Sequence, residues 1–466
     1  MWHTSDVIFQ QLLNEEAGCL SYLIGCSQAG QGLIVDPARD RVDDYVALAR
    51  RKGLTITGIV ETHVHADHIS GNQALAAKTG ARIHIHPAAN AAFAHDPVED
   101  GRQLRVGSVA LDVVHTPGHT PESISLLITD LSRGDEPWFV LTGDTLFVGD
   151  VGRPDFGGEQ AAARLYASLT ERLLRLPDSV EVYPAHGAGS SCGRAMSSKT
   201  ATTIGFERRF NAALQAGGVD DFVRRLMTGL PPKPPNFDRI IARNRAQALA
   251  PSGTPHPLSA AQTREAIDKG ACILDVRTSE EYGQGHIPGA VHVWIESPQF
   301  ANRAGLFIPA EAPVVLVVSS PTDLDRAVQG LGRIGLDAIA GHLQWGMTEW
   351  KSQGLPMGAV PQISVHDLAT MKEERPDLVV IDVREPFEWD EGHIEGALHV
   401  PMSEALARKE LVPADRPKAV VCAGGLRSST VISALSRAGL TNWFNVIGGM
   451  TAWQKGGYST VKRAAP

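Results

Sequence analysis

Several features that this 466-residue chain lacks exclude whole classes of protein. It has only five cysteines, an odd count that does not suggest a disulfide framework. No apolar run reaches the length of a membrane span, and the first residues show no signal-peptide pattern. The net charge is −9 and no run is rich in lysine and arginine, which argues against nucleic acid as the main partner. We therefore expect a cytoplasmic protein that acts on small molecules, without a membrane or nucleic-acid partner.

Clusters of proline mark the expected domain boundaries. The length of the chain predicts three domains. One cluster, at 251–257, follows a first domain at residues 1–250. Another, at 356–361, separates a second domain at 258–357 from a third at 362–461.

Three histidines and an aspartate fall within six residues, H-x-H-x-D-H at 63–68, directly after the β-rich run 55–60. Imidazole and carboxylate together suit zinc, iron or manganese, and a loop after a strand can direct several of them at one point. Further residues of this type follow strand-like runs beside glycine or proline: His119, Asp144 and His186. The alternative, a surface loop that happens to be rich in histidine, does not explain this recurrence. The pattern predicts a metal site presented by the loops of a sheet.

This order of residues resembles that of the metallo-β-lactamase superfamily over residues 1–250. The resemblance implies an αββα sandwich with the metal at one end of its two sheets. It does not fix the reaction, because hydrolases and oxygenases share the scaffold.

The second half of the chain contains an internal repeat of about 100 residues. The pattern D-V-R, followed by G-H-I-x-G-A, occurs at 275–290 and again 107 positions later at 382–397. Both copies resemble rhodanese domains. The resemblance implies a small α/β domain with a parallel five-stranded sheet for each copy.

In the second copy, Cys422 opens the loop Cys-Ala-Gly-Gly-Leu-Arg between a strand and a helix. Backbone N–H groups, the positive helix N-terminus and the guanidinium of Arg427 all favour thiolate over thiol there. A buried, inert thiol is the alternative, but Arg427 and the glycines have no packing reason to lie together. Cys422 is therefore predicted to be a nucleophile that carries a persulfide. In the rhodanese family a loop of this length fits sulfur transfer.

The first copy lacks this apparatus. At the spacing of 103 residues between the copies, the residue that corresponds to Cys422 is Ser319. No arginine replaces Arg427 in this loop, and Asp323 would place a negative charge near a persulfide. A serine nucleophile would need an adjacent base, which the sequence does not offer. We expect an inactive module that spaces or docks its neighbours.

The order of the domains resembles the fused persulfide dioxygenase–rhodanese proteins of bacterial sulfide detoxification, as does G-R-x-D at 152–155. The resemblance implies one Fe(II) per chain, held by His63, His119 and Asp144. It implies that a second set of residues orients these ligands or hydrogen-bonds to bound water: His65, Asp67, His68 and His186. It also implies a supporting ion pair between Arg153 and Asp155, for which a surface salt bridge is the alternative.

The sequence leaves other assignments open. The same seven residues would complete a site for two Zn²⁺ ions per chain in a thioester hydrolase of the glyoxalase II type, and a sulfur carrier or sensor with a structural metal is a third reading. The expected small-molecule partners are a thiol persulfide, dioxygen, sulfite and thiosulfate. The sequence does not reveal which thiol carries the persulfide. We also expect the protein to be a homo-oligomer. Cys192 is a candidate substrate contact in a Gly/Ser-rich loop, whereas the remaining cysteines are expected to be core thiols: Cys19, Cys26 and Cys272.

Overall fold

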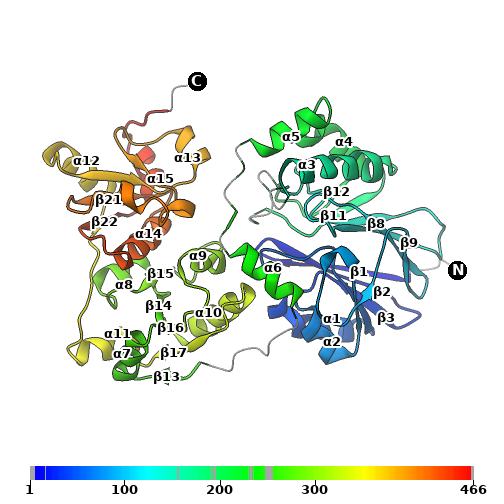
Figure 1. The fold of residues 1–466 in the computed structure, drawn as a ribbon, viewed down its shortest axis with the longest axis horizontal. Coiled ribbons are helices and arrows are strands. Elements are labelled where there is room, and N and C mark those ends of the chain that lie inside the picture. Colours follow the sequence, from blue (N-terminus) through cyan, green and yellow to red (C-terminus); the bar gives the residue numbers. More distant parts are fainter. Residues whose placement is uncertain are drawn as a thin grey trace. The chain divides into compact units, whose positions relative to one another are not determined.

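The computed structural model describes residues 6–15, 17–154, 157–188, 190, 193, 196–228, 230, 233–234, 236–246 and 255–462. The chain forms two compact units, residues 1–250 with 332–335, and residues 251–331 with 336–466 (Figure 1). Among the described residues, no helix is both long and apolar enough to cross a membrane.

The first unit contains two six-stranded sheets. The strands of the first sheet are β1 (Val7–Asn14), β2 (Cys19–Cys26), β3 (Gln31–Val35), β4 (Thr55–Val60), β5 (Arg82–Ile85) and β6 (Asp96–Pro97), in that order. The strands of the second sheet also lie side by side in chain order: β7 (Gln103–Val106), β8 (Val109–His115), β9 (Ile124–Asp130), β10 (Phe139–Gly143), β11 (Glu181–Pro184) and β12 (Thr202–Thr203). The main core lies between the sheets, because Tyr22 and Ile24 of the first pack in one cluster with Leu111 and Leu126 of the second.

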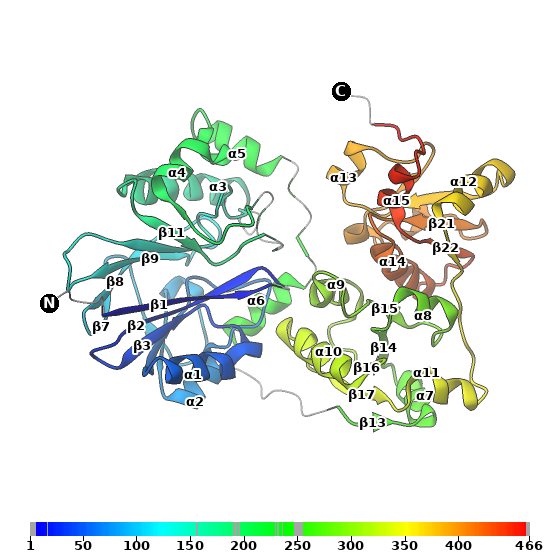
Figure 2. The same ribbon diagram turned by 180° about the vertical axis from the view of Figure 1, so that it is seen from behind.

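Helices cover the outer face of each sheet (Figure 2). The helices of this unit are α1 (Val42–Arg51), α2 (Asn72–Thr79), α3 (Gly158–Ala167), α4 (Ile204–Phe210), α5 (Val219–Met227) and α6 (Phe237–Arg245). Tyr45 of α1 and Leu75 of α2 are buried against the first sheet, and Leu165 of α3 and Phe222 of α5 against the second. These four layers are the αββα sandwich expected from the sequence.

The second unit contains the two repeats, each with its own five-stranded sheet. The elements of the first copy are β13 (Pro257–Leu258), α7 (Ala260–Asp268), β14 (Cys272–Asp275), α8 (Ser279–Gln284), β15 (Val291–His292), α9 (Phe300–Phe307), β16 (Val314–Val317), α10 (Pro321–Arg333), β17 (Ile339–Leu343) and α11 (Gly346–Ser352). Those of the second are β18 (Gln362–Ile363), α12 (Val365–Glu374), β19 (Val379–Asp382), α13 (Pro386–Glu391), β20 (Leu398–His399), β21 (Lys418–Val421), α14 (Leu426–Arg437), β22 (Trp443–Val446) and α15 (Gly449–Lys455).

The two small sheets have the same strand order, β13-β17-β16-β14-β15 and β18-β22-β21-β19-β20. All pairs in both sheets are parallel. The expected parallel five-stranded sheets are therefore present in both copies. In a parallel sheet the carboxyl ends of the strands meet at one edge, which is where the loop after β21 carries Cys422.

Candidate metal centre and sulfurtransferase site

The metal-type residues of the first unit follow the ends of four strands. His63 comes after β4, His119 after β8, Asp144 directly after β10 and His186 two residues after the end of β11. All four side chains are at most 1% exposed. The sandwich therefore carries these residues into its interior, although each is polar.

His63, His119 and Asp144 form one group whose ligand atoms all lie within 4.8 Å of one another. Asp144 Oδ2 is 3.7 Å from His63 Nε2 and 3.5 Å from His119 Nε2. This oxygen is buried and, within the described part of the chain, has no hydrogen-bond partner. Because a buried carboxylate oxygen without a donor is unfavourable, a metal ion at this point would satisfy it.

Hydrogen bonds fix the tautomers of both imidazoles so that Nε2 carries the lone pair. His119 Nδ1 donates to the carbonyl oxygen of Arg153 at 2.9 Å. Thr62 Oγ1 donates to Asp36 Oδ2 at 2.8 Å and therefore accepts from His63 Nδ1 at 2.9 Å. Such partners for the second ring nitrogen are typical of histidines that ligate metals. Burial, reinforced by the neighbouring His65, also holds the pKa of His63 well below its usual range, as a neutral ligand requires.

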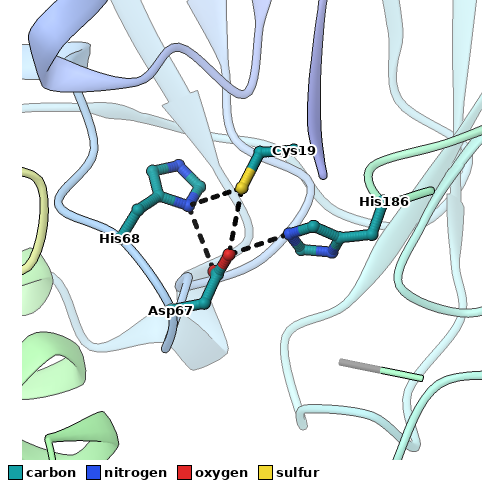
Figure 3. A group of neighbouring side chains, drawn as sticks. All are labelled: Cys19, Asp67, His68 and His186. Carbon is teal, nitrogen blue, oxygen red and sulfur yellow. Dashed lines mark hydrogen bonds and ion pairs between the residues drawn. The ribbon is translucent and has the colours of Figure 1, made fainter. Parts of the chain in front are cut away.

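A second group consists of Cys19, Asp67, His68 and His186, which converge around the Asp67 carboxylate (Figure 3). Cys19 Sγ donates to Asp67 Oδ2 at 3.2 Å, and His68 Nδ1 lies 3.1 Å from Asp67 Oδ1. His186 joins the two groups, because its Nε2 is 3.0 Å from Asp67 Oδ2 and its Nδ1 is 2.6 Å from Asp144 Oδ1. Both ring nitrogens of His186 thus face carboxylate oxygens.

His65 belongs to a third group. Its Nε2 lies 3.3 Å from Asp36 Oδ1 and 3.2 Å from Glu61 Oε2, so the ring is directed at two carboxylates. The sequence placed His65, Asp67, His68 and His186 beside the three candidate ligands, and the structure has them in these two adjoining groups. Cys19, in contrast, was expected to be a core thiol and instead contacts the site.

Three buried polar residues that the sequence did not reveal hold the loops of the site. Asn244 of α6 donates from Nδ2 to the carbonyl oxygens of His65 and His68, both at 2.8 Å. Glu122 Oε1 accepts from the backbone N–H of Val64 at 3.1 Å. Glu207 Oε2 accepts from the backbone N–H of Gly149 at 3.0 Å, beyond Asp144. None of the three was predicted as a site residue, since only the tertiary structure brings them to the loops.

Two other predictions fall partly outside the described residues. Arg153 is buried, and its guanidinium lies over the ring of Phe237 at 6.0 Å. Its predicted partner Asp155 and the candidate substrate contact Cys192 both lie outside the residues that the structure describes.

Cys422 lies between β21 and α14, where the sequence predicts a persulfide cradle. The thiol is buried, and its sulfur accepts from the backbone N–H of Gly425 at 3.0 Å and from Ser428 Oγ at 3.6 Å. Gly449 is required here, since it has a φ of +51° and a Cβ would lie 2.1 Å from the carbonyl oxygen of Cys422. The loop is thus closed tightly around its cysteine.

Arg427 has a different partner from the one expected. Its two terminal nitrogens bind the two carboxylate oxygens of Glu388, each at 2.6 Å. Burial alone would raise the pKa of Glu388, but the hydrogen bond and charge of Arg427 outweigh it and lower that pKa. The guanidinium is therefore largely neutralised by a neighbouring carboxylate instead of facing the sulfur alone.

The residue equivalent to Cys422 in the first copy is Val318, and the mapping onto Ser319 is wrong by one position. Asp275 pairs with Val317 as its repeat Asp382 pairs with Val421, so the residue after each strand corresponds. The spacing of 103 holds only from Gly341 of β17 onward, because a register shift between Val314 and Val315 interrupts the pairing of β16 with β17. Ser319 Oγ donates to Glu281, the repeat of Glu388, at 3.1 Å.

Residues 15–186 match the metallo-beta-lactamase superfamily, and residues 259–353 and 364–456 each match the rhodanese-like domain. A hydroxyacylglutathione hydrolase of Polaromonas sp. (strain JS666 / ATCC BAA-500) is 40% identical over 169 residues, which span 36% of this chain and 61% of the hydrolase. The mitochondrial persulfide dioxygenase ETHE1 of Homo sapiens is 28% identical over 241 residues, 52% of this chain and 88% of that protein.

A solved structure also covers most of the chain. A metallo-beta-lactamase from Staphylococcus aureus subsp. aureus COL is 32% identical and aligns with a TM-score of 0.66 over 73% of this chain and 99% of its own. The chain therefore belongs to the metallo-beta-lactamase superfamily, as a fusion of a domain homologous to persulfide dioxygenases with two rhodanese-like domains.

Proposed function

We propose that the first domain is an iron-dependent persulfide dioxygenase and that the last domain transfers sulfane sulfur. The observation that carries the proposal is the group of two imidazoles and one carboxylate, His63, His119 and Asp144. Two histidines and one carboxylate with open positions are typical of non-haem Fe(II) oxygenases. Matches to persulfide dioxygenases over 52% of the chain support the same activity.

The neighbouring histidines support a site with three protein ligands. His65 is directed at Asp36 and Glu61, and His186 is placed between Asp67 and Asp144. A hydrolase site with two zinc ions would need both of these imidazoles as ligands. In this arrangement His186 instead orients Asp144, and the hydrogen bond from His186 Nδ1 leaves Asp144 Oδ2 to face the other two ligands.

The proposed reaction is R–S–SH + O₂ + H₂O → R–SH + SO₃²⁻ + 2 H⁺. Bound Fe(II) would supply open coordination positions for dioxygen and for the persulfide sulfur. His63 and His119 keep their Nε2 lone pairs directed inward through Thr62 and the carbonyl of Arg153. The burial of these residues keeps bulk water away from the reacting atoms.

Cys422 is proposed to carry the sulfane sulfur in the last domain. Its thiolate would attack the outer sulfur of thiosulfate, and the S–S bond to the sulfonate would break as sulfite leaves with the electron pair. The N–H of Gly425 and the N-terminus of α14 then face the persulfide anion. The first rhodanese-like domain is proposed to be inactive, since Val318 offers no nucleophile.

A two-zinc thioester hydrolase is the second candidate. The group of Cys19, Asp67, His68 and His186 beside Asp144 has the residue types for another metal ion. The 40% identity to a hydroxyacylglutathione hydrolase favours the same activity. Against it stands the thiol of Cys19, which donates to the Asp67 oxygen that a second metal would need.

Metal analysis with an Asp144→Ala variant tests the proposal. We expect about one iron per chain in the purified protein and loss of both iron and persulfide-dependent oxygen uptake in Asp144→Ala, because two neutral imidazoles alone bind Fe(II) weakly. Asp96→Ala on β6, where the carboxylate pairs with the exposed Arg82, is the matched control and should retain both. Two zinc ions per chain with hydrolysis of a glutathione thioester would instead support the hydrolase.

A further inference from the structure

The helix that follows the Cys422 loop is held by the inactive copy. Ser433 Oγ of α14 accepts from the backbone N–H of His292 at 2.8 Å, and Ser429 Oγ lies 3.0 Å from His292 Nδ1. His292 belongs to β15 of the first copy, and all three residues are at most 1% exposed. Every residue of α14 from Ser428 to Leu435 is buried. The first copy therefore covers the helix whose N-terminus forms the Cys422 loop.

A charged residue of the first copy also lies near the cysteine. Arg303 lies on α9, and its guanidinium is close enough to interact electrostatically with Cys422, Arg427 and Glu388. Within the described part of the chain, the Arg303 side chain has no hydrogen bond or ion pair. The donors of this guanidinium are therefore available to an anionic ligand.

The other guanidiniums near Cys422 already have carboxylate partners. Arg427 binds Glu388 through two hydrogen bonds, and Arg384 binds both oxygens of Asp382. Burial and the like charge of Arg427 lower the pKa of Arg303 to about 10, so it remains a cation at neutral pH. Arg303 thus contributes a positive charge near the sulfur, and within the described residues no carboxylate is bound directly to it.

We infer that the sulfurtransferase site is composite, and that Arg303 of the inactive copy binds the sulfonate oxygens of thiosulfate or sulfite next to Cys422. A guanidinium matches the geometry of such an oxoanion through parallel N–H···O hydrogen bonds. The inference rests on the proposed sulfur transfer at Cys422 and adds a substrate-binding residue from another domain.

The role of Arg303 follows from the charges in the transfer step. Thiosulfate carries two negative charges, and its outer sulfur must approach an anionic thiolate. As the Cys422–sulfur bond forms and the sulfur–sulfonate bond breaks, sulfite leaves as a dianion. A cation that holds the three oxygens reduces the repulsion on approach and orients the outer sulfur toward Cys422.

Replacement of Arg303 by methionine in the full chain tests the inference, because methionine keeps an unbranched stem without the charge. With thiosulfate as donor and cyanide as acceptor, we expect KM for thiosulfate to rise about tenfold or more, as for loss of a hydrogen bond to a charged group, with a smaller change in kcat. Arg303→Lys should recover part of the affinity. Arg264→Met on α7, which removes an exposed arginine that pairs with Asp268, should leave KM unchanged.

A second measurement does not depend on turnover. Iodoacetate and iodoacetamide both alkylate a thiolate, but only iodoacetate carries a negative charge. The ratio of their rates at Cys422, followed by mass spectrometry of its peptide, should fall about fivefold in Arg303→Met and stay constant in Arg264→Met.

The two measurements separate the possible failures. If the unmodified chain does not turn over thiosulfate, the proposed function fails and the alkylation ratio alone decides whether Arg303 binds anions at Cys422. If the chain is active but Arg303→Met changes neither KM nor the ratio, the composite site is wrong and the proposed function stands. A loss of kcat alone, with both KM and ratio constant, would make Arg303 a purely structural residue and also overturn the inference.

Discussion

At the scale of single residues, one carboxylate of the rhodanese fold has a different partner in each copy. Glu388 binds Arg427 beside the cysteine, whereas its repeat Glu281 accepts a hydrogen bond from Ser319. The position of the cysteine is occupied by Val318 in the first copy. The first copy therefore lacks the nucleophile and the arginine together, and a single substitution would not restore both.

We predict that Val318→Cys in a Cys422→Ser background does not create a sulfurtransferase. The new thiol would lie near Glu281, whose negative charge raises the pKa of a thiol, and no arginine follows it in the loop. The measurement is thiosulfate-to-cyanide transfer by the double variant.

Cys422→Ser alone gives the background rate of transfer. The matched variant combines Ser319→Cys, one residue after Val318, with Cys422→Ser. Transfer at even a tenth of the unmodified rate by either double variant would show that the inactive copy retains a working cradle.

At the scale of elements, a single helix residue holds the loop that presents the metal-type side chains. Asn244 of α6 donates to the carbonyl oxygens of His65 and His68 and accepts from the N–H of Ser70 at 2.9 Å. The loop between β4 and α2 has no regular secondary structure across 63–69, so its backbone groups depend on such partners. A helix far along the chain thereby holds the loop that follows His63.

Asn244→Ala should weaken metal binding about tenfold to a hundredfold, as is typical when a residue that supports a metal ligand is lost. It should also lower the free energy of unfolding of the first unit by about 1–3 kcal/mol, because two buried carbonyls lose their donor. Metal affinity is measured by competition with a chelator, and stability by thermal unfolding of metal-free protein.

Asp238→Ala, on the same helix but exposed and paired with Lys233, is the control and should change neither quantity. Unchanged metal affinity in Asn244→Ala would mean that the loop keeps its conformation without α6.

At the scale of the whole molecule, one chain combines a proposed source of sulfite with a proposed sulfane sulfur carrier. The product of the first reaction is an acceptor for the second, since sulfite and a Cys422 persulfide give thiosulfate. Fusion raises the local concentration of one site's product at the other, to the millimolar range for a short flexible tether. The domain order is therefore consistent with thiosulfate as the product of the complete chain.

The unmodified protein, given excess persulfide and oxygen, should accumulate thiosulfate, whereas Cys422→Ser should consume oxygen at the same rate and release mainly sulfite. The reason is that serine cannot carry sulfane sulfur, while the metal centre lies in another domain. Both anions are quantified after derivatisation, with the spontaneous reaction of sulfite with persulfide subtracted. An equal ratio of sulfite to thiosulfate in both proteins would indicate two independent activities.

The sequence by itself indicated the fold of each domain and supplied candidate residues for both sites. The motif at 63–68, with His119, Asp144 and His186, indicated a metal site because ligands must be of particular types and must follow strands. The D-V-R repeat and Cys422 indicated the rhodanese domains in the same way. These features are local, since a few adjacent residues carry each of them.

Only the tertiary structure decided which atoms face one another. The separation of the metal-type residues into three groups depends on partners distant in sequence, such as Cys19 beside Asp67. The register of β14 with β16 moved the counterpart of Cys422 to Val318, because a shift within a strand is invisible to residue counting. Arg303 lies 119 positions before Cys422 and belongs to another domain. No local pattern marks such a residue, because its role depends on a surface that forms only when the two copies pack together.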